Sequence, residues 1–123
     1  MNLLAAVLKV CSLADPVVVE TVIAEAQAQH IDPEALLAIG VIESGLRLRN
    51  VLGVQACYSS KPVLSMKACV HIGAVSLHNK WPNTVTHAGM HRAFRRYNNT
   101  AHRHKYATKA LHIVKTLRRL SKG

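Results

Sequence analysis

The residue best placed for chemistry is Glu43, in the sequence VIESG at positions 41–45. It follows the run ALLAIGVI at 35–42, which is apolar on all sides and therefore typical of a buried helix. Apolar surroundings and the negative end of a helix dipole both disfavour the charged form of a carboxyl group. We therefore expect a raised pKa for Glu43, which suits a general acid that protonates a leaving oxygen.

The alternative interpretation of Glu43 is an ordinary solvated residue on the last turn of its helix. Arg47 lies four residues further on and could pair with it in that case. Most glutamates at helix ends are simply solvated, so position alone leaves both interpretations open.

Four segments after residue 33 follow one another in an informative order. They read AIGVIESG at 38–45, LGVQ at 52–55, IGA with a later leucine at 72–77, and AFRRYN at 93–98. In this order they resemble the soluble lytic transglycosylase family, the lysozyme-like enzymes that cleave the glycan strands of bacterial peptidoglycan. The resemblance covers about residues 33–99. Two features differ from the family pattern: Asn99-Thr100 replaces the usual Ala-Gly, and the interval between Glu43 and Gln55 is short.

The resemblance implies a lysozyme-like fold, no metal, no cofactor, and Glu43 as the catalytic residue. In this family the glutamic acid first protonates the oxygen between N-acetylmuramic acid and N-acetylglucosamine. The resulting carboxylate then takes a proton from the muramyl 6-hydroxyl, which closes a 1,6-anhydro ring.

The distribution of acidic residues favours this reaction over hydrolysis. Most glycoside hydrolases need two carboxyl groups, whereas this chain has no acidic residue after Glu43. A lysozyme-type hydrolase remains the alternative, with its second carboxylate supplied by Asp15, Glu20 or Glu25.

Four further residues are candidates for substrate binding. Ser44 could orient the Glu43 carboxyl or contact the sugar, but it could equally cap the helix end. The resemblance implies that Tyr97 lies near the acid and that Gln55 lies in the substrate groove. Asn98 could bind an N-acetyl group or only terminate a helix. A core tyrosine at a helix end is the alternative for Tyr97.

Charge divides the chain in two. All six acidic residues lie in residues 1–43 beside one base, while residues 44–123 hold fifteen bases and no acid, which gives the net charge of +10. Such a basic region suggests a polyanionic partner, either an anionic membrane or wall surface contacted by the C-terminal helix, or nucleic acid. A non-enzymatic nucleic-acid-binding module is the second functional class, although aromatic residues for base stacking are scarce. A solvated helix face with no dedicated partner also accounts for much of this charge.

Histidines and cysteines give weaker indications. His87 and His91 are four residues apart, as two metal ligands on a helix can be, but no acid or cysteine lies close in sequence to complete a site. Of the three cysteines, Cys57 and Cys69 could form a disulfide, or all three could be buried thiols.

The N-terminal sequence MNLLAAVLKVCSLA makes a poor signal peptide, because no base precedes its apolar run. We interpret it as a segment that packs on the core. Action in the bacterial envelope would then require another route, such as a bacteriophage virion or lysis protein, or a secretion or conjugation machinery.

The elements that would position these residues are all predicted to be helices in one domain, 1–123. Asp15-Pro16 and Asp32-Pro33 predict helix starts, and Gly45 predicts a stop. Ser65 can cap a third helix, and either Thr84 or Thr86 begins a fourth. We expect about five helices packed around the second, at about 16–29, 33–44, 66–80, 84–98 and 102–120, with residues 46–64 rich in loops. The third should direct Ala68, Ile72, Val75 and Leu77 inward. The last has an apolar stripe: Tyr106, Ala110, Ile113, Val114 and Leu117.

Overall fold

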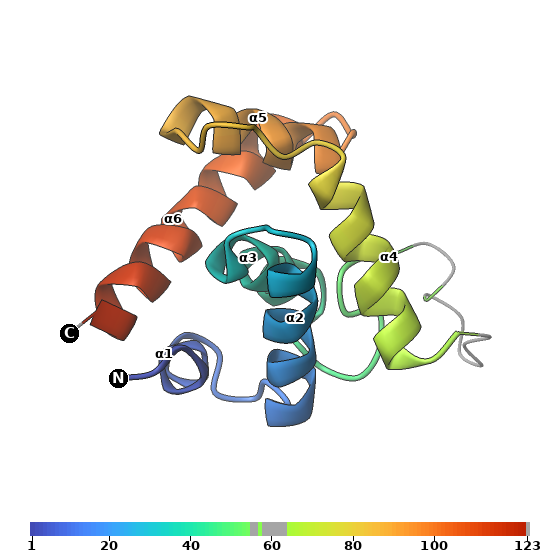
Figure 1. Cartoon of the computed structure of the whole chain (residues 1–123), viewed down its shortest axis with the longest axis vertical. Coiled ribbons are helices and arrows are strands. Elements are labelled where there is room, and N and C mark those ends of the chain that lie inside the picture. The colour runs from blue at the N-terminus through green and yellow to red at the C-terminus, as the bar shows by residue number, and fades with distance from the viewer. Residues whose placement is uncertain (55–56, 58–63, 123) are drawn as a thin grey trace.

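Six helices make up the computed structural model, which describes residues 1–54, 57 and 64–122. They are α1 (Leu3–Val10), α2 (Pro16–Ala28), α3 (Pro33–Ser44), α4 (Met66–His78), α5 (His87–Tyr97) and α6 (Arg103–Lys122). The described residues contain no strand, so the predicted all-α class is confirmed. Figure 1 shows α3 in the middle of the molecule, with α5 across the top and α6 running diagonally below it.

Polar side chains fix the helix starts as the sequence predicts. The Asp15 carboxylate accepts a hydrogen bond from the N–H of Val17 at 2.8 Å, and Ser65 and Thr86 cap α4 and α5 in the same way. Asp32 also precedes its helix, but its side chain makes no capping bond. It pairs instead with Arg118 of α6 at 2.6 Å, which ties the start of α3 to the C-terminal helix.

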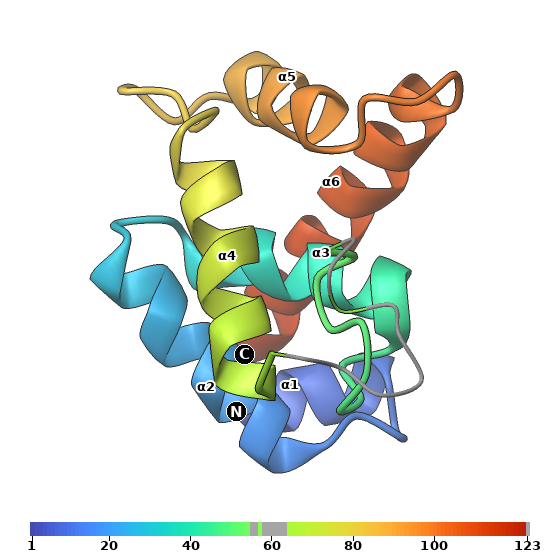
Figure 2. The ribbon, with the colours of Figure 1, turned by 90° about the vertical axis from the view of Figure 1, so that its right-hand side faces the viewer.

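The apolar N-terminal segment forms a helix of its own, α1. Asn2 caps it through the N–H of Ala5 at 2.8 Å, and Ala6 and Val7 are fully buried. The prediction that this segment packs on the core is confirmed, and it accounts for a sixth helix beyond the five expected. In Figures 1 and 2, α1 lies beside the C-terminal end of α6, and the two helices are in contact.

The core is centred on α3, as its apolar sequence predicts. Residues 35–40 are all buried, and α3 packs against α2 and α6. Phe94 of α5 and the apolar stripe of α6 complete the core from the other side. α3 is thus enclosed along the middle of its length, and only its two ends, residues 33–34 and Val41–Ser44, are partly exposed.

The predicted inward face of α4 is partly wrong. Ile72 is 41% exposed, while Cys69, Val70, Gly73, Ala74 and Leu77 are buried. Gly73 lies on this face where the backbone of α4 closely approaches the segment after α3. A Cβ on Gly73 would lie only 2.7 Å from Leu52.

Cys57 and Cys69 form a disulfide, so one of the two arrangements left open by the sequence is realised. The bond connects the segment after α3 to the first turn of α4. Cys11 remains a thiol, and its Sγ lies 3.4 Å from the carbonyl oxygen of Gly45.

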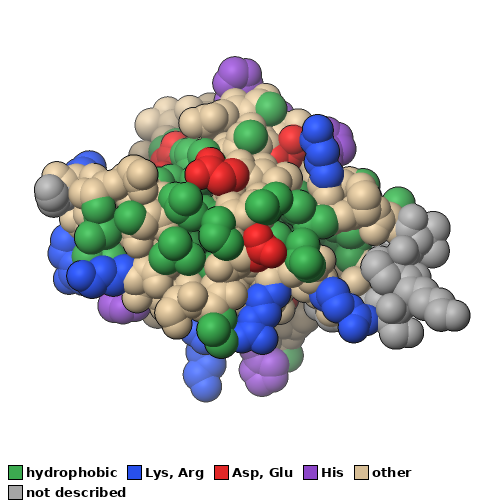
Figure 3. Space-filling model, turned by 90° about the horizontal axis from the view of Figure 1, so that it is seen from below, with side chains coloured by type: hydrophobic (Ala, Val, Ile, Leu, Met, Phe, Trp, Pro, Cys, Tyr) green, Lys and Arg blue, Asp and Glu red, His purple; other side chains and the backbone are tan. Residues whose placement is uncertain are grey.

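Charge is segregated on the surface as well as in the sequence. The face seen from below in Figure 3, which lies over α1 and the start of α2, carries acidic and apolar side chains in its middle and basic ones at its margins. Within the described residues, no helix combines the length and apolar character needed to cross a bilayer.

Candidate active site

The end of α3 places Glu43 where the chain reverses direction. Gly45 adopts a left-handed conformation with φ of 69°, and the N–H groups of Gly45 and Leu46 bond to the carbonyls of Val41 and Gly40. Leu46 then turns back and is fully buried against Gly40, which has no side chain to obstruct it. As a result, the segment 46–54 runs back beside the last turn of α3.

Ser44 holds this reversal together. Its hydroxyl donates to the carbonyl of Val51 at 2.9 Å, lies 3.2 Å from the carbonyl of Gly40, and accepts from the N–H of Leu46 at 3.1 Å. This is the geometry of a helix-end cap, the alternative to sugar binding that the sequence left open. Ser44 therefore shapes the segment that faces Glu43.

Gly53 lies directly against the Glu43 carboxyl group. A Cβ at position 53 would be 2.5 Å from Cδ of Glu43 and within 2.8 Å of both carboxyl oxygens. The φ of Gly53 is also positive, at 70°, a conformation that side chains disfavour. The backbone of residue 53 can cover one side of the carboxyl group only because it is glycine.

The other contact to Glu43 comes from α6. The hydroxyl of Tyr106 donates to Oε2 of Glu43 at 3.2 Å. Burial raises the pKa of Glu43 above its usual range, and the hydrogen bond from Tyr106 offsets part of this rise. The direction predicted for the pKa and its main cause, burial, agree with this environment.

No base neutralises the Glu43 carboxyl group within the described residues. Arg47 is exposed and makes no ion pair with Glu43, so the surface pairing considered from the sequence is not formed. A half-buried carboxyl group with a hydroxyl donor and no cation is suited to holding a proton.

Tyr97 acts on the segment that covers Glu43. Its hydroxyl donates to the carbonyl of Leu52, the residue before Gly53. It also lies close to Gly73 of α4, where a Cβ would be 3.1 Å from the hydroxyl oxygen. Tyr97 is thus one residue removed from the backbone that touches the acid.

The remaining two candidates are less informative. Asn98 is the C-cap residue of α5, where its N–H bonds to the carbonyl of Phe94, and it is half-buried. Gln55 lies outside the described residues.

Tyr106 is the functional candidate that the sequence analysis missed. It was assigned only to the apolar stripe of α6, where it is 8% exposed. A tyrosine hydroxyl in a buried stripe usually finds a polar partner. That rule, applied to the one tyrosine in this stripe, could have connected α6 with the carboxyl group that ends α3.

A surface pocket of about 430 Å³ adjoins the end of α3. Ser44 lines this pocket together with two residues that precede α2 and three residues that follow α3. These are Leu13, Asp15, Arg47, Leu48 and Arg49. Of the three acidic residues considered as a second carboxylate, Asp15 is therefore the one that lines the same pocket as Ser44, which is next to Glu43 in the sequence. Its carboxylate is already engaged as the N-cap of α2.

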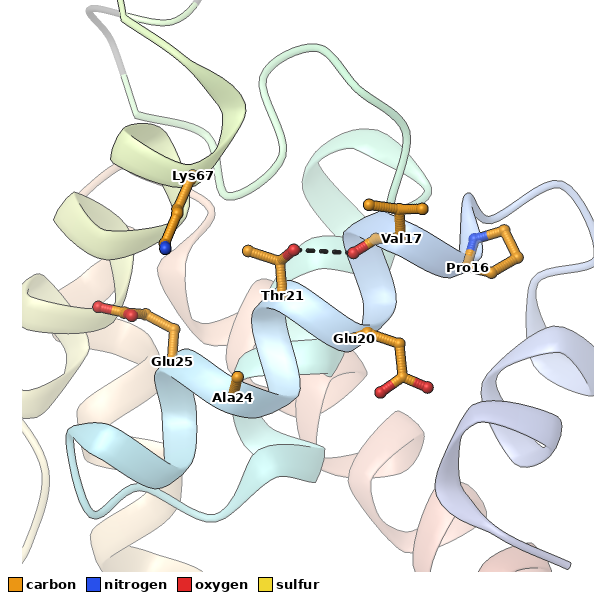
Figure 4. A pocket seen from close by; sticks show the side chains of 7 residues that line it. All are labelled: Pro16, Val17, Glu20, Thr21, Ala24, Glu25 and Lys67. Atoms are coloured by element: carbon orange, nitrogen blue, oxygen red, sulfur yellow. Dashed lines mark hydrogen bonds between the residues drawn. The ribbon is translucent and has the colours of Figure 1, made fainter.

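The other early acids lie elsewhere. Glu20 and Glu25 line a pocket of about 480 Å³ along α2, closed on one side by Lys67 of α4 (Figure 4). Glu25 also pairs with His71. Glu43 does not line this pocket. Although the pocket is large, we therefore assign it no role in the chemistry at the end of α3.

The histidines do not assemble a metal site within the described residues, where no group of three suitable ligands occurs. His91 instead stacks edge-on against His104, with ring centroids 4.9 Å apart. Burial lowers the pKa of His91, and nearby Arg95 lowers it further.

Comparisons with protein-family models, with curated proteins and with solved structures find no match to this chain. Function must therefore be argued from the site itself.

Proposed function

We propose that this protein is a peptidoglycan lytic transglycosylase in which Glu43 serves first as acid and then as base. The observation that carries the proposal is the half-buried Glu43 carboxyl group, whose raised pKa favours the protonated form that an acid catalyst needs. The order of motifs around it supplies the substrate class: glycan strands of N-acetylmuramic acid and N-acetylglucosamine.

In the proposed reaction, the proton of Glu43 moves to the glycosidic oxygen as the bond between that oxygen and C1 of the muramyl residue breaks. The 6-hydroxyl oxygen of the same sugar bonds to C1, and its proton passes to the Glu43 carboxylate. The products are a free 4-hydroxyl and a 1,6-anhydro end. No water is consumed, and Glu43 regains its proton.

A single carboxyl group suffices for this cycle, and few other carboxyl groups of this chain are available for catalysis. All acids precede Glu43 or are Glu43 itself. Asp32 and Glu34 face Arg118, and Glu25 faces His71. These pairings leave few carboxyl groups available as a second catalytic residue.

The direct test is lysis of purified peptidoglycan by the wild type and by Glu43→Gln. We expect the variant to lose at least about a thousandfold in rate, since it can neither give nor take the proton. Because burial raises the pKa of Glu43, the charged form of this carboxyl group destabilises the folded state, so its replacement by a neutral amide should not lower the melting temperature at neutral pH. A folded variant with full lytic activity would refute the proposal.

A lysozyme-type hydrolase is the second candidate, favoured by the position of Asp15 in the pocket next to Ser44. The variant Asp15→Asn separates the two reactions, because asparagine caps a helix as well as aspartate does. The transglycosylase should retain its rate in this variant, whereas a hydrolase that uses Asp15 as its second carboxylate should lose it.

The site of action under this proposal is the bacterial cell envelope. The basic surface of the C-terminal half would hold the enzyme on the anionic wall or membrane. A bacteriophage particle or lysis system, or a secretion machinery, would bring it there, and the other proteins of that machinery would be its partners.

A further inference from the structure

A third pocket lies where α5 ends and α6 begins, and arginine side chains form most of its lining. Its volume is about 290 Å³, and its lining residues are Arg92, Arg95, Arg96, Asn99 and Arg103. Arg92 and Arg96 are one turn apart on α5, Arg95 lies between them, and Arg103 comes from the first turn of α6. Four arginines from two helices, together with Asn99 from the connection between these helices, thus line the same hollow.

No carboxylate of the protein balances these charges. All acidic residues belong to residues 1–43, and the ion pairs of the described residues involve His71 and Arg118 only. Arginine keeps its charge at any pH a protein experiences. The pocket is therefore a fixed concentration of positive charge.

Two further observations indicate that the arginines serve a ligand. The Nε of Arg95 is buried and has no hydrogen-bond partner in the described structure, and an unpaired buried donor is costly. In addition, α6 begins with Arg103 and has no acid in its first turn, although the positive end of a helix dipole disfavours cations there. An anion in the pocket would offset the positive charge at the start of α6 and give the guanidinium group of Arg95, which lines the pocket, an acceptor.

We propose that this pocket binds a phosphate group. A guanidinium group binds phosphate oxygens through two parallel N–H donors. Four such groups carry more N–H donors than the two oxygens of a carboxylate can accept, so a phosphate group with more oxygens is the better partner. The N-terminus of α6 adds a favourable field for phosphate, which opposes the unfavourable field from the C-terminus of α5. The volume accommodates a phosphate together with part of the molecule that carries it.

The shape of the site favours a single phosphate group over a nucleic acid strand. Binding along a strand uses a groove of basic residues together with aromatic side chains for stacking. Here the arginines converge on one hollow, and none of its lining residues is aromatic.

The test is titration with inorganic phosphate by calorimetry, at constant ionic strength maintained with chloride. We compare the wild type with Arg92→Gln/Arg96→Gln, whose two arginines are exposed and whose replacement should leave the fold intact. The matched control is Lys109→Gln/Arg119→Gln, which removes two exposed charges from α6 outside the pocket. We expect phosphate affinity to fall about tenfold or more in the pocket variant, and less than about twofold in the control.

Two arms identify the source of the phosphate. Vesicles with phosphatidylglycerol, compared with phosphatidylcholine, test a lipid headgroup, and a soluble poly(glycerol phosphate) tests a wall polymer. Selective loss of binding in the pocket variant, in either arm, supports the proposal and names the source.

The site is independent of the proposed catalysis. Glu43→Gln should bind phosphate as tightly as the wild type, so failure of one proposal does not affect the other. Equal loss of phosphate binding in the pocket and control variants would show general charge attraction and overturn the inference. Binding of a DNA duplex that falls equally in both variants, with no saturable phosphate binding, would overturn it as well.

Discussion

At the scale of single residues, Glu43 is defined by two neighbours from distant parts of the chain. Gly53 covers one side of its carboxyl group with bare backbone, and Tyr106 donates a hydrogen bond to it. Burial and the hydrogen bond act on the pKa in opposite directions, and burial is the larger effect. A change at Tyr106 should therefore change the pKa of Glu43.

The variant Tyr106→Phe tests this balance. Since the hydrogen bond lowers the pKa of Glu43, its removal should raise that pKa further. An acid catalyst is active only while protonated, so the alkaline limb of the pH–rate profile should move to higher pH. The measurement is the lytic rate from about pH 4 to 9.

Tyr97→Phe is the matched control. It removes a hydroxyl that bonds to the Leu52 carbonyl instead of to Glu43, so the rate can fall but the alkaline limb should stay in place. A profile that moves equally in both variants would contradict the role given to Tyr106.

The sequence predicted the acid but not its partner. Glu43 could be predicted because a charged residue at the end of ALLAIGVI is a local anomaly. Tyr106 fits the apolar period of its own helix, and its contact with Glu43 spans 63 residues. Ser44 could be read either as a cap or as a sugar ligand, and only the course of residues 46–54 shows that its hydroxyl is used by the backbone.

At the scale of elements, three glycines allow the close approaches that build the site. Gly40 admits Leu46, Gly53 admits the Glu43 carboxyl group, and Gly73 admits Leu52. Each is a contact between α3 or α4 and the segment after α3. The Cys57–Cys69 disulfide fastens the same segment to α4.

Gly53→Ala should therefore damage the site itself. Its positive φ costs about 1–2 kcal/mol for a residue with a Cβ, and that Cβ would also collide with the Glu43 carboxyl group. We expect loss of stability and at least about a hundredfold loss of lytic rate. Thermal unfolding and lysis measured at low temperature separate the two effects.

Gly45→Ala is the control for backbone strain. Its φ is nearly the same, 69°, but a Cβ there meets nothing closer than Cys11 Sγ at 3.7 Å. It should lose about as much stability from strain while keeping its rate when folded. If both variants keep full activity, the packing of Gly53 on Glu43 is not needed for catalysis.

Helix starts were predictable because caps are local, as at Asp15, Ser65 and Thr86. The inward face of α4 was not, because Ile72 reads as a core residue by hydropathy alone. The actual core face of α4 includes Gly73, which is buried because Leu52 packs closely against it. Periodicity also contains no information about the reversal after Gly45, which depends on side-chain to backbone bonds.

At the scale of the whole molecule, the first third of the chain is acidic and the remainder is strongly basic. The net charge of +10 combines fifteen bases in residues 44–123 with six acids and one base in residues 1–43. A peptidoglycan wall and its attached polymers carry negative charge, so under the proposed function electrostatic attraction should speed the encounter with the wall.

Lysis should accordingly depend on salt. Between about 0.05 M and 0.5 M NaCl we expect the apparent KM for purified sacculi to rise roughly tenfold, with kcat nearly unchanged, because salt screens exposed charges. Steady-state rates at several sacculus concentrations measure both constants. A salt-independent KM would mean that the basic surface does not serve wall binding.

The central claim, that one carboxyl group cleaves the glycan without water, is tested most directly by mass spectrometry of the muropeptides released from purified peptidoglycan. The account predicts products with 1,6-anhydromuramyl ends from the wild type, and no such products from Glu43→Gln. Products one water heavier, with reducing ends, would contradict it.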